Sequence, residues 1–258
     1  MVTYEDMYVP FVATAIVYPM ITFVSLRLPA IRKLEGGALF AAACVTALVN
    51  ATVVTPFALQ AFWQHLYEPG ATLDCKAGAT NLAKVPGSDL DALACGLVCG
   101  YFAQDCVLML ICRRTLLKDL GGASAYAIMW MHHIVSLLVW PYAVVSGSGV
   151  FFVSYFLATE VTNIGQNLFL LANRSKLLPY EVPVGVGWII SFFVIRVLPV
   201  PWLIWAYAKV VLLQSCGLTT GETVAAAVCV PIPFGLNLYW FQKIISKALR
   251  MLSRARKE

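Results

Sequence analysis

Long, nearly uncharged stretches of apolar residues recur along this chain and restrict it to one kind of fold. Only 12% of the 258 residues are charged and 60% are hydrophobic, with a mean hydropathy of +0.80. Soluble domains carry about 25% charged residues. A single helix needs about 20 mainly apolar residues to cross ~30 Å of hydrocarbon, and several stretches reach that length. The sequence therefore indicates a membrane protein and excludes a soluble globular domain.

Seven stretches are long and apolar enough for transmembrane helices, which predicts an all-α, polytopic membrane helical bundle. They are Tyr8–Leu28, Gly37–Trp63, Leu90–Cys112, Ser124–Ser146, Val150–Ala172, Val184–Lys209 and Thr223–Ile245. Only Gly147 to Gly149 separate the fourth stretch from the fifth, so we expect a tight antiparallel hairpin there. We expect residues 1–36 to hold an N-terminal segment, the first span and a basic loop. Residues 37–245 would then form a six-span bundle, and residues 246–258 a basic tail.

Most of the 18 lysines and arginines fall on one side of the predicted membrane. The opposite side has only Lys76, Lys84 and Lys209. The positive-inside rule then predicts a lumenal or outside N-terminus and a cytosolic C-terminus, in the endoplasmic reticulum or another endomembrane. No basic region precedes the first span, so we expect it to be retained. Because orientation accounts for the net charge of +5, no nucleic-acid partner is expected.

The C-terminal tail combines apolar residues at helical spacing with basic residues on other faces. The apolar set is Ile245, Ala248, Leu249 and Leu252, and the basic set is Lys243, Lys247, Arg250 and Arg254. This pattern predicts a basic amphipathic helix that lies along the membrane surface and contacts anionic headgroups. Two alternatives are a plain continuation of the last span into solvent and a contact with an acidic protein partner.

The chain contains eight cysteines, most of them inside apolar spans, where they act as small packing residues. Cys75 and Cys216 differ because both lie in loops that the charge distribution places in the lumen. A disulfide between them and a pair of free loop thiols are both compatible with the sequence.

Ionisable residues inside the predicted spans are few, and such residues are functional candidates because burying them in hydrocarbon is costly. They are Asp105, His132, His133, Glu160 and Arg196. With a rise of ~1.5 Å per residue, all five reach a similar depth, so we expect them to converge in one cavity. Arg196 needs an anionic partner there. That partner is either a carboxylate of the protein, in a structural ion pair, or a carboxylate or phosphate of a substrate.

Helical spacing places further polar residues beside these groups. Ser136 stacks on His132 in the fourth span, and Glu160, Asn163 and Asn167 form a polar stripe on the fifth. Because a short turn joins the two spans, we expect Glu160 to orient an imidazole and stabilise its protonated form. The alternative is that these groups only hydrogen-bond one another and hold the bundle together.

A di-iron centre would need more histidine ligands than the chain offers. It contains three histidines in total, whereas membrane di-iron enzymes use many more. No metal site is predicted.

Five short stretches occur in an order that is typical of one family of membrane proteins. They are GYFAQDCVLML with Asp105, WMHHIVSLLVW with the paired histidines, FLATEVTNIGQNLFLL with Glu160, FFVIRVLP with Arg196, and LNLYWFQKII near the end. In these pieces, over about residues 37–245, the chain resembles the TLC family, which includes the ceramide synthases. Ceramide synthases share a further HD and Asp-rich stretch where this chain has LATEVTNIGQN. The chain therefore resembles the non-ceramide-synthase branch more closely.

The resemblance implies acyl transfer from acyl-CoA to an amine, with the paired histidines at the reacting centre. His132, His133 and Glu160 are then the catalytic candidates. The substrate-binding candidates are Asp105, Ser136, Asn163, Asn167 and Arg196. Acyl-CoA would be a co-substrate, no cofactor would be bound tightly, and the partners would be membrane lipids and a fatty acyl chain. The alternative function is a non-catalytic lipid-homeostasis protein or an accessory subunit of a membrane protein complex.

Overall fold

The computed structural model describes residues 2–34, 37–67, 72–75, 81–119, 122–175, 178–214 and 216–255. Within these ranges the chain is a helical bundle whose only β-structure is a few isolated bridges. The first half contains α1 (Tyr4–Arg27), α2 (Pro29–Arg32), α3 (Ala38–Tyr67), α4 (Asp89–Ile111), α5 (Arg113–Asp119) and α6 (Ala123–Ser146). The second half contains α7 (Val150–Ala158), α8 (Val161–Arg174), α9 (Leu178–Phe192), η1 (Phe193–Val197), α10 (Val200–Tyr207), η2 (Ala208–Leu213), α11 (Thr220–Cys229) and α12 (Pro231–Ala255), where η marks a π-helix.

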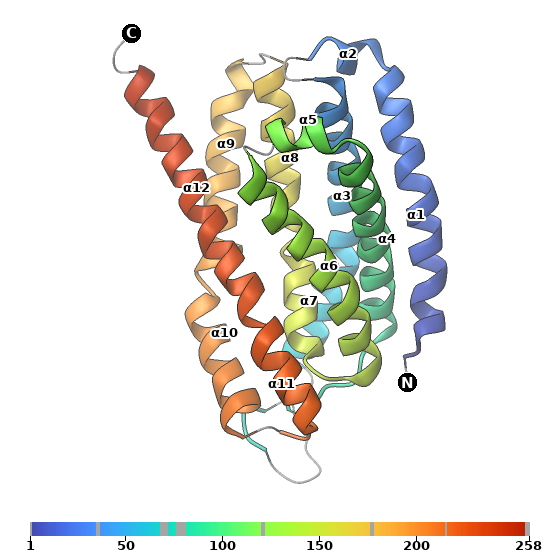
Figure 1. Cartoon of the computed structure of the whole chain (residues 1–258). Helices are drawn as coiled ribbons and strands as arrows, with labels where there is room; N and C mark the ends of the chain where they lie inside the picture. The colour runs from blue at the N-terminus through green and yellow to red at the C-terminus, as the bar shows by residue number, and fades with distance from the viewer. Residues whose placement is uncertain are drawn as a thin grey trace.

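The long helices run between two ends of the bundle, and the two chain termini lie at opposite ends (Figure 1). Within the described part of the chain, six helical segments are long and apolar enough to cross a membrane: Tyr4–Arg27, Ala38–Tyr67, Asp89–Ile111, Ala123–Ser146, Tyr180–Leu213 and Thr220–Arg250. The remaining predicted span, Val150–Ala172, is interrupted and forms α7 followed by α8. The all-α membrane bundle predicted from the sequence is confirmed, and about seven passages remain consistent with the structure.

The short helix α7 lies at the centre of the molecule. Every one of its nine residues is buried, and it packs against α3, α4 and α6. A helix that is apolar on all sides must be surrounded by protein or lipid; here its neighbours are other helices. Because α8 continues from α7 after a break at Thr159 and Glu160, the interruption of this passage lies inside the bundle.

Two glycines make the tight turn that the sequence predicted between the fourth and fifth spans. Gly147 and Gly149 adopt φ values of 77° and 75°, a left-handed conformation that glycine enters without a steric penalty. The turn is also bonded to the α3–α4 loop: Val85 donates to the Gly147 carbonyl at 3.0 Å, and Gly149 donates to the Ala83 carbonyl at 2.8 Å. The end of the α6–α7 hairpin is thereby fixed to a loop far away in sequence.

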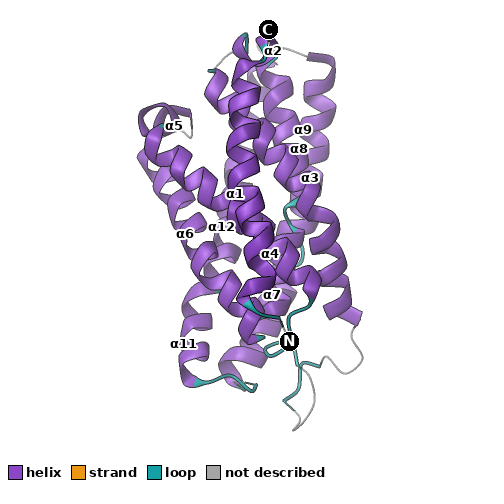
Figure 2. Cartoon of the chain, turned by 90° about the vertical axis from the view of Figure 1, so that its right-hand side faces the viewer, coloured by secondary structure: helices purple, strands orange, loops and turns teal. Residues whose placement is uncertain are grey.

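The helices α1 and α4 run side by side (Figure 2), and glycines let them approach closely. A Cβ at Gly96 would lie 2.6 Å from the Met7 carbonyl oxygen. A Cβ at Gly100 would lie 1.9 Å from the Thr14 hydroxyl and 2.5 Å from the Phe11 carbonyl oxygen. This is the small-residue spacing by which membrane helices gain van der Waals contact without a hydrophobic driving force.

The last helix, α12, differs from the tail expected at the membrane surface. It continues unbroken from Pro231 to Ala255, and its C-terminal turns project beyond the neighbouring helices (Figure 1). The described part of the tail therefore continues the last span directly, which is one of the two alternatives that the sequence left open.

We expect Gly100→Ala to lower the free energy of unfolding by about 2 kcal/mol, because the new methyl group overlaps Thr14 and the α1 backbone. Unfolding by a denaturing detergent in mixed micelles measures this. Gly187→Ala is the matched control, since a Cβ at Gly187 in α9 meets nothing within 4 Å. Equal stability of the two variants would contradict close α1–α4 packing.

Candidate functional site

A polar cavity of about 1260 Å³, its open mouth included, lies within the bundle. Its wall contains seven of the residues singled out from the sequence: Asp105, His132, His133, Glu160, Asn163, Asn167 and Arg196. They come from α4, α6, the α7–α8 break, α8 and η1. The five ionisable residues thus lie around one cavity, as their estimated depths predicted.

The two adjacent histidines have different surroundings. His133 is 3% exposed and stacks on Phe102 with ring centroids 4.6 Å apart. His132 is only half-buried and makes edge contacts with Phe102 and Trp240, at centroid distances of 5.3 and 5.5 Å. Among the described residues, no hydrogen bond is formed by either ring nitrogen of His132. The His132 imidazole is therefore held by aromatic rings and keeps both nitrogens available.

The carboxylate beside the histidines is Asp105, on α4. Its Oδ2 lies 3.4 Å from Nδ1 of His133, in an orientation that leaves Nδ1 without an aligned hydrogen bond in the described structure. The sequence instead predicted Glu160 as the partner of an imidazole. Glu160 accepts a hydrogen bond from Asn163 at 2.9 Å and lies 3.8 Å from Arg196. The expected contact between Glu160 and an imidazole is thus absent from the described structure. Asp105 lies beside His133 instead, and Glu160 lies beside Arg196.

Arg196 is 6% exposed, and every nitrogen of its guanidinium has a partner in the protein. Nε donates to the Thr162 hydroxyl at 2.7 Å and Nη1 to Oδ1 of Asn237 at 3.3 Å. Nη2 donates to the Thr159 carbonyl at 2.8 Å and to Oδ1 of Asn163 at 3.3 Å. Of the two alternatives for Arg196, this geometry favours the structural ion pair over a contact with substrate.

The contacts of Arg196 also give a physical reason for the α7–α8 break. The Thr159 hydroxyl bonds to the Phe156 carbonyl, and the Thr162 hydroxyl bonds to the Thr159 carbonyl. Such side chains compete with the helical ladder for carbonyl groups. Arg196 itself lies on the π-helix η1, just before Pro199, which has no N–H to donate. The sequence analysis predicted neither the α7–α8 break nor the π-helix η1. The sequence signals for them are the Thr159–Thr162 spacing and Pro199.

Ser136 does not line the polar cavity. It lines a second cavity of about 860 Å³, which is bordered mainly by apolar side chains of α6, α7, α11 and α12. His132 lines this cavity too. A third, smaller void of about 280 Å³ includes His132, Glu160, Arg196 and Trp240 in its wall. It shares His132 with both larger cavities, so the three voids meet at this side chain.

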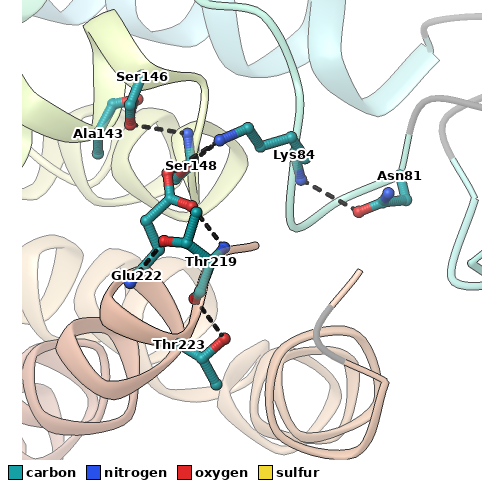
Figure 3. Close-up of polar contacts among 8 residues, drawn as sticks. All are labelled: Asn81, Lys84, Ala143, Ser146, Ser148, Thr219, Glu222 and Thr223. Atoms are coloured by element: carbon teal, nitrogen blue, oxygen red, sulfur yellow. Dashed lines mark hydrogen bonds and ion pairs between the residues drawn. The ribbon is translucent and has the colours of Figure 1, made fainter. Parts of the chain in front are cut away.

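Ser148 and Glu222 of the apolar cavity wall belong to a polar network, whose contacts Figure 3 shows. Nζ of Lys84 donates to Oε1 of Glu222 at 2.9 Å and to the Ser148 hydroxyl at 2.7 Å. The Ser148 hydroxyl bonds to Glu222 as well, and the Thr219 amide donates to Oε2 of Glu222 at 2.7 Å. The α3–α4 loop, the α6–α7 turn and the start of α11 are thereby joined.

Cys75 and Cys216 form a disulfide with their Cα atoms 5.2 Å apart. The sequence left this pairing open. Lys209 adds an ion pair with Asp74 at 2.8 Å, so the same loop is attached at neighbouring points to the segment around α11.

A buried pair between α3 and α4 was missed because His65 and Asp91 lie near the ends of their spans. Nε2 of His65 lies 2.7 Å from Oδ2 of Asp91, and Ser154 of α7 bonds to the other oxygen of Asp91. The carboxylate stands between the imidazole and the hydroxyl, so His65 does not activate Ser154 as the base of a catalytic triad does. The group joins three helices. No cluster of three or more potential metal ligands occurs in the described ranges.

Long apolar helices around a polar interior define an integral, multi-pass membrane protein. The family model for the TLC domain matches residues 41–246, and the chain therefore belongs to the TLC-domain family. Comparison with curated proteins and with solved structures gives no significant match.

We expect Arg196→Leu to lower the free energy of unfolding by about 3 kcal/mol, because Glu160 is left buried without its cation. Adding Glu160→Leu to this variant should restore part of the loss, since no uncompensated charge remains. Denaturing-detergent titration of the two variants tests this. If Arg196→Leu alone is as stable as the wild type, Arg196 has no structural role.

Proposed function

We propose that this TLC-domain protein binds a lipid with a fatty acyl chain and transfers the acyl group, with His132 at the reacting centre. One observation carries the proposal: His132 is the side chain at which the apolar and polar cavities meet. A side chain that assists acyl transfer has to contact both the acyl group, in the apolar cavity, and the polar acceptor, in the polar cavity.

The size and chemistry of the cavities support different occupants. The apolar cavity is lined mainly by hydrocarbon side chains and suits a hydrocarbon chain. The polar cavity, with amide groups from Asn163 and Asn167, suits the headgroup of the acceptor. An acyl carbonyl located between them would lie beside His132.

The chemistry proposed for His132 is general base catalysis, with acyl-CoA as the co-substrate. The nitrogen of an amine acceptor forms a C–N bond to the acyl carbon, and the C–S bond of the thioester breaks. The proton released by the amine passes to His132 and then to the departing thiolate. His133, stacked on Phe102 and close to Asp105, acts as a positioning residue for its neighbour.

A non-catalytic role in lipid homeostasis, or as an accessory subunit of a membrane complex, is the second candidate. It is favoured by the hydrogen bonds that hold all three guanidinium nitrogens of Arg196 within the protein, as in a packing core. Both functions require bound membrane lipid and differ in whether His132 is reactive.

The orientation and location are also proposals. We place the basic end of the bundle, which holds α2, α5 and the C-terminus (Figure 1), in the cytosol of an endomembrane system such as the endoplasmic reticulum. Lys247 and Arg250 in the C-terminal part of α12 are exposed and can contact anionic headgroups there.

We expect His132→Ala to reduce lipid product by about 10²-fold or more while stability is retained, because the imidazole makes no hydrogen bond that packing needs. Mass spectrometry of lipids formed by the purified protein in nanodiscs, from a long-chain acyl-CoA and amine-bearing lipids, measures this. His133→Phe is the matched variant: it keeps the stacking on Phe102 and should lower activity less. Full activity of His132→Ala would remove His132 from the mechanism. A wild type without product would favour the non-catalytic role.

A glycosylation acceptor inserted between α3 and α4 should be modified in microsomes, and one appended after the C-terminus should not. The reason is that the α3–α4 loop lies at the end that we assign to the lumen. A shift in electrophoretic mobility that glycosidase reverses reports the modification. Modification of the C-terminal acceptor alone would reverse the assignment.

A further inference from the structure

The amide of Asn237 holds a buried hydrogen-bond donor without a partner. Asn237 lies on α12 and is 2% exposed. Its Nδ2 forms no hydrogen bond to any described residue. A buried donor in this condition destabilises the folded state. Native structures retain such groups where a ligand, a water or a functional demand accounts for them.

The orientation of this amide is fixed by Arg196. Oδ1 of Asn237 accepts from Nη1 of Arg196 at 3.3 Å. Turning the amide over would place its NH₂ group against the guanidinium, where two donors would face each other. Nδ2 is therefore the group that remains for another partner, and Arg196 is in turn fixed by Thr159 and Thr162.

Asn237 lines the small cavity that also includes His132, Glu160 and Trp240. Other buried side chains also lack partners, among them Asn50 and Gln104. Neither of these lines any of the three cavities that meet at His132. Two further side chains without partners, His133 and Trp188, line the polar cavity. Among the described side chains with an unpaired buried nitrogen or oxygen, Asn237 alone lines the small cavity.

The missing partner must be an acceptor that reaches this void. The cavity borders the apolar cavity, with which it shares Trp140, Phe156 and Pro233. A molecule that fills the apolar cavity with a hydrocarbon chain would present the polar end of that chain here. For a fatty acyl lipid the first acceptor after the chain is the carbonyl oxygen.

We propose that Nδ2 of Asn237 donates a hydrogen bond to the carbonyl oxygen of the lipid acyl group bound beside His132. The assignment rests on the proposed function, because that function supplies the acyl group. A fixed neutral donor aimed at a carbonyl strengthens its bond as negative charge develops on the oxygen during acyl transfer. Asn237 would then bind the carbonyl and stabilise the oxyanion, while His132 handles the proton.

The test uses the full chain in phosphatidylcholine nanodiscs and an unreactive probe, 2-heptadecanone labelled with ¹³C at the carbonyl. This ketone has a long chain and a single acceptor. Isotope-edited infrared spectra compare the frequency of the ketone's carbonyl stretch in protein-containing nanodiscs with its frequency in empty nanodiscs. We expect a band at lower frequency in the wild type, because hydrogen bonding weakens the C=O bond.

Two variants separate the donor from its surroundings. Asn237→Leu removes the amide, and Asn237→Asp keeps an oxygen acceptor for Arg196 but has no N–H. Both should lose the shifted band. Asn167→Leu is the matched control: Asn167 lines the polar cavity, but its Nδ2 already donates to the Asn163 carbonyl at 2.8 Å. It should keep the band.

An activity assay gives an independent comparison. With acyl-CoA as the donor, Asn237→Leu should lower kcat by about 10²-fold with a smaller change in KM. His132→Ala should lower product formation by about 10²-fold or more yet keep the shifted band. Suppose that product formation depends on His132. If the wild type then shows no shifted band, or if Asn237→Leu keeps the shifted band, the role of Asn237 is wrong and the proposed function stands. If the band depends on Asn237 but no product forms, the carbonyl site stands and acyl transfer is wrong.

Discussion

The buried charge of Arg196 is the constraint on which the interior of this protein depends. A guanidinium remains ionised under essentially all conditions, and at 6% exposure little of it can be solvated by water. Its donors must therefore be satisfied by the chain itself. The structure meets this requirement by bringing the Thr159 carbonyl, at the α7–α8 break, and the side chains of Thr162 and Asn237 to the guanidinium. Irregular backbone at membrane depth is tolerated here because it is enclosed by protein.

The same constraint explains how polar and apolar cavities exist side by side. The helix α7 is buried on all sides, so it separates the α3–α4 side of the bundle from α11 and α12. Beyond the break, α8 carries amide side chains in place of apolar ones. A single passage thus borders a hydrocarbon-lined void along α7 and a polar void along α8, and the change occurs at the depth of the histidine pair.

The sequence predicts the helices well and the contacts between them poorly, for a physical reason. Span positions and the convergence of ionisable residues follow from hydropathy, helix rise and the cost of exposing charge to lipid, all of which are local properties. The choice of partner is set by packing between distant helices. That is why Glu160, expected beside an imidazole, is found with Arg196, and Asp105 from α4 takes its place near His133. Ser136 shares a helix face with His132 yet lines only the apolar cavity, because α7 and α12 cover that side.

The histidine pair shows how adjacent residues of one type acquire different roles. Neighbouring positions on a helix differ by about 100° in direction, so the two imidazoles cannot share one environment. His133 points to where α4 supplies Phe102 and Asp105, and it is held there. His132 points to the meeting place of the cavities, where aromatic rings hold it by their edges and no polar group of the described chain occupies its nitrogens. A side chain restrained in position yet unpaired at its reactive atoms is pre-organised at low cost. His133, whose ring centroid lies 5.4 Å from that of His132, helps to hold the His132 ring in place.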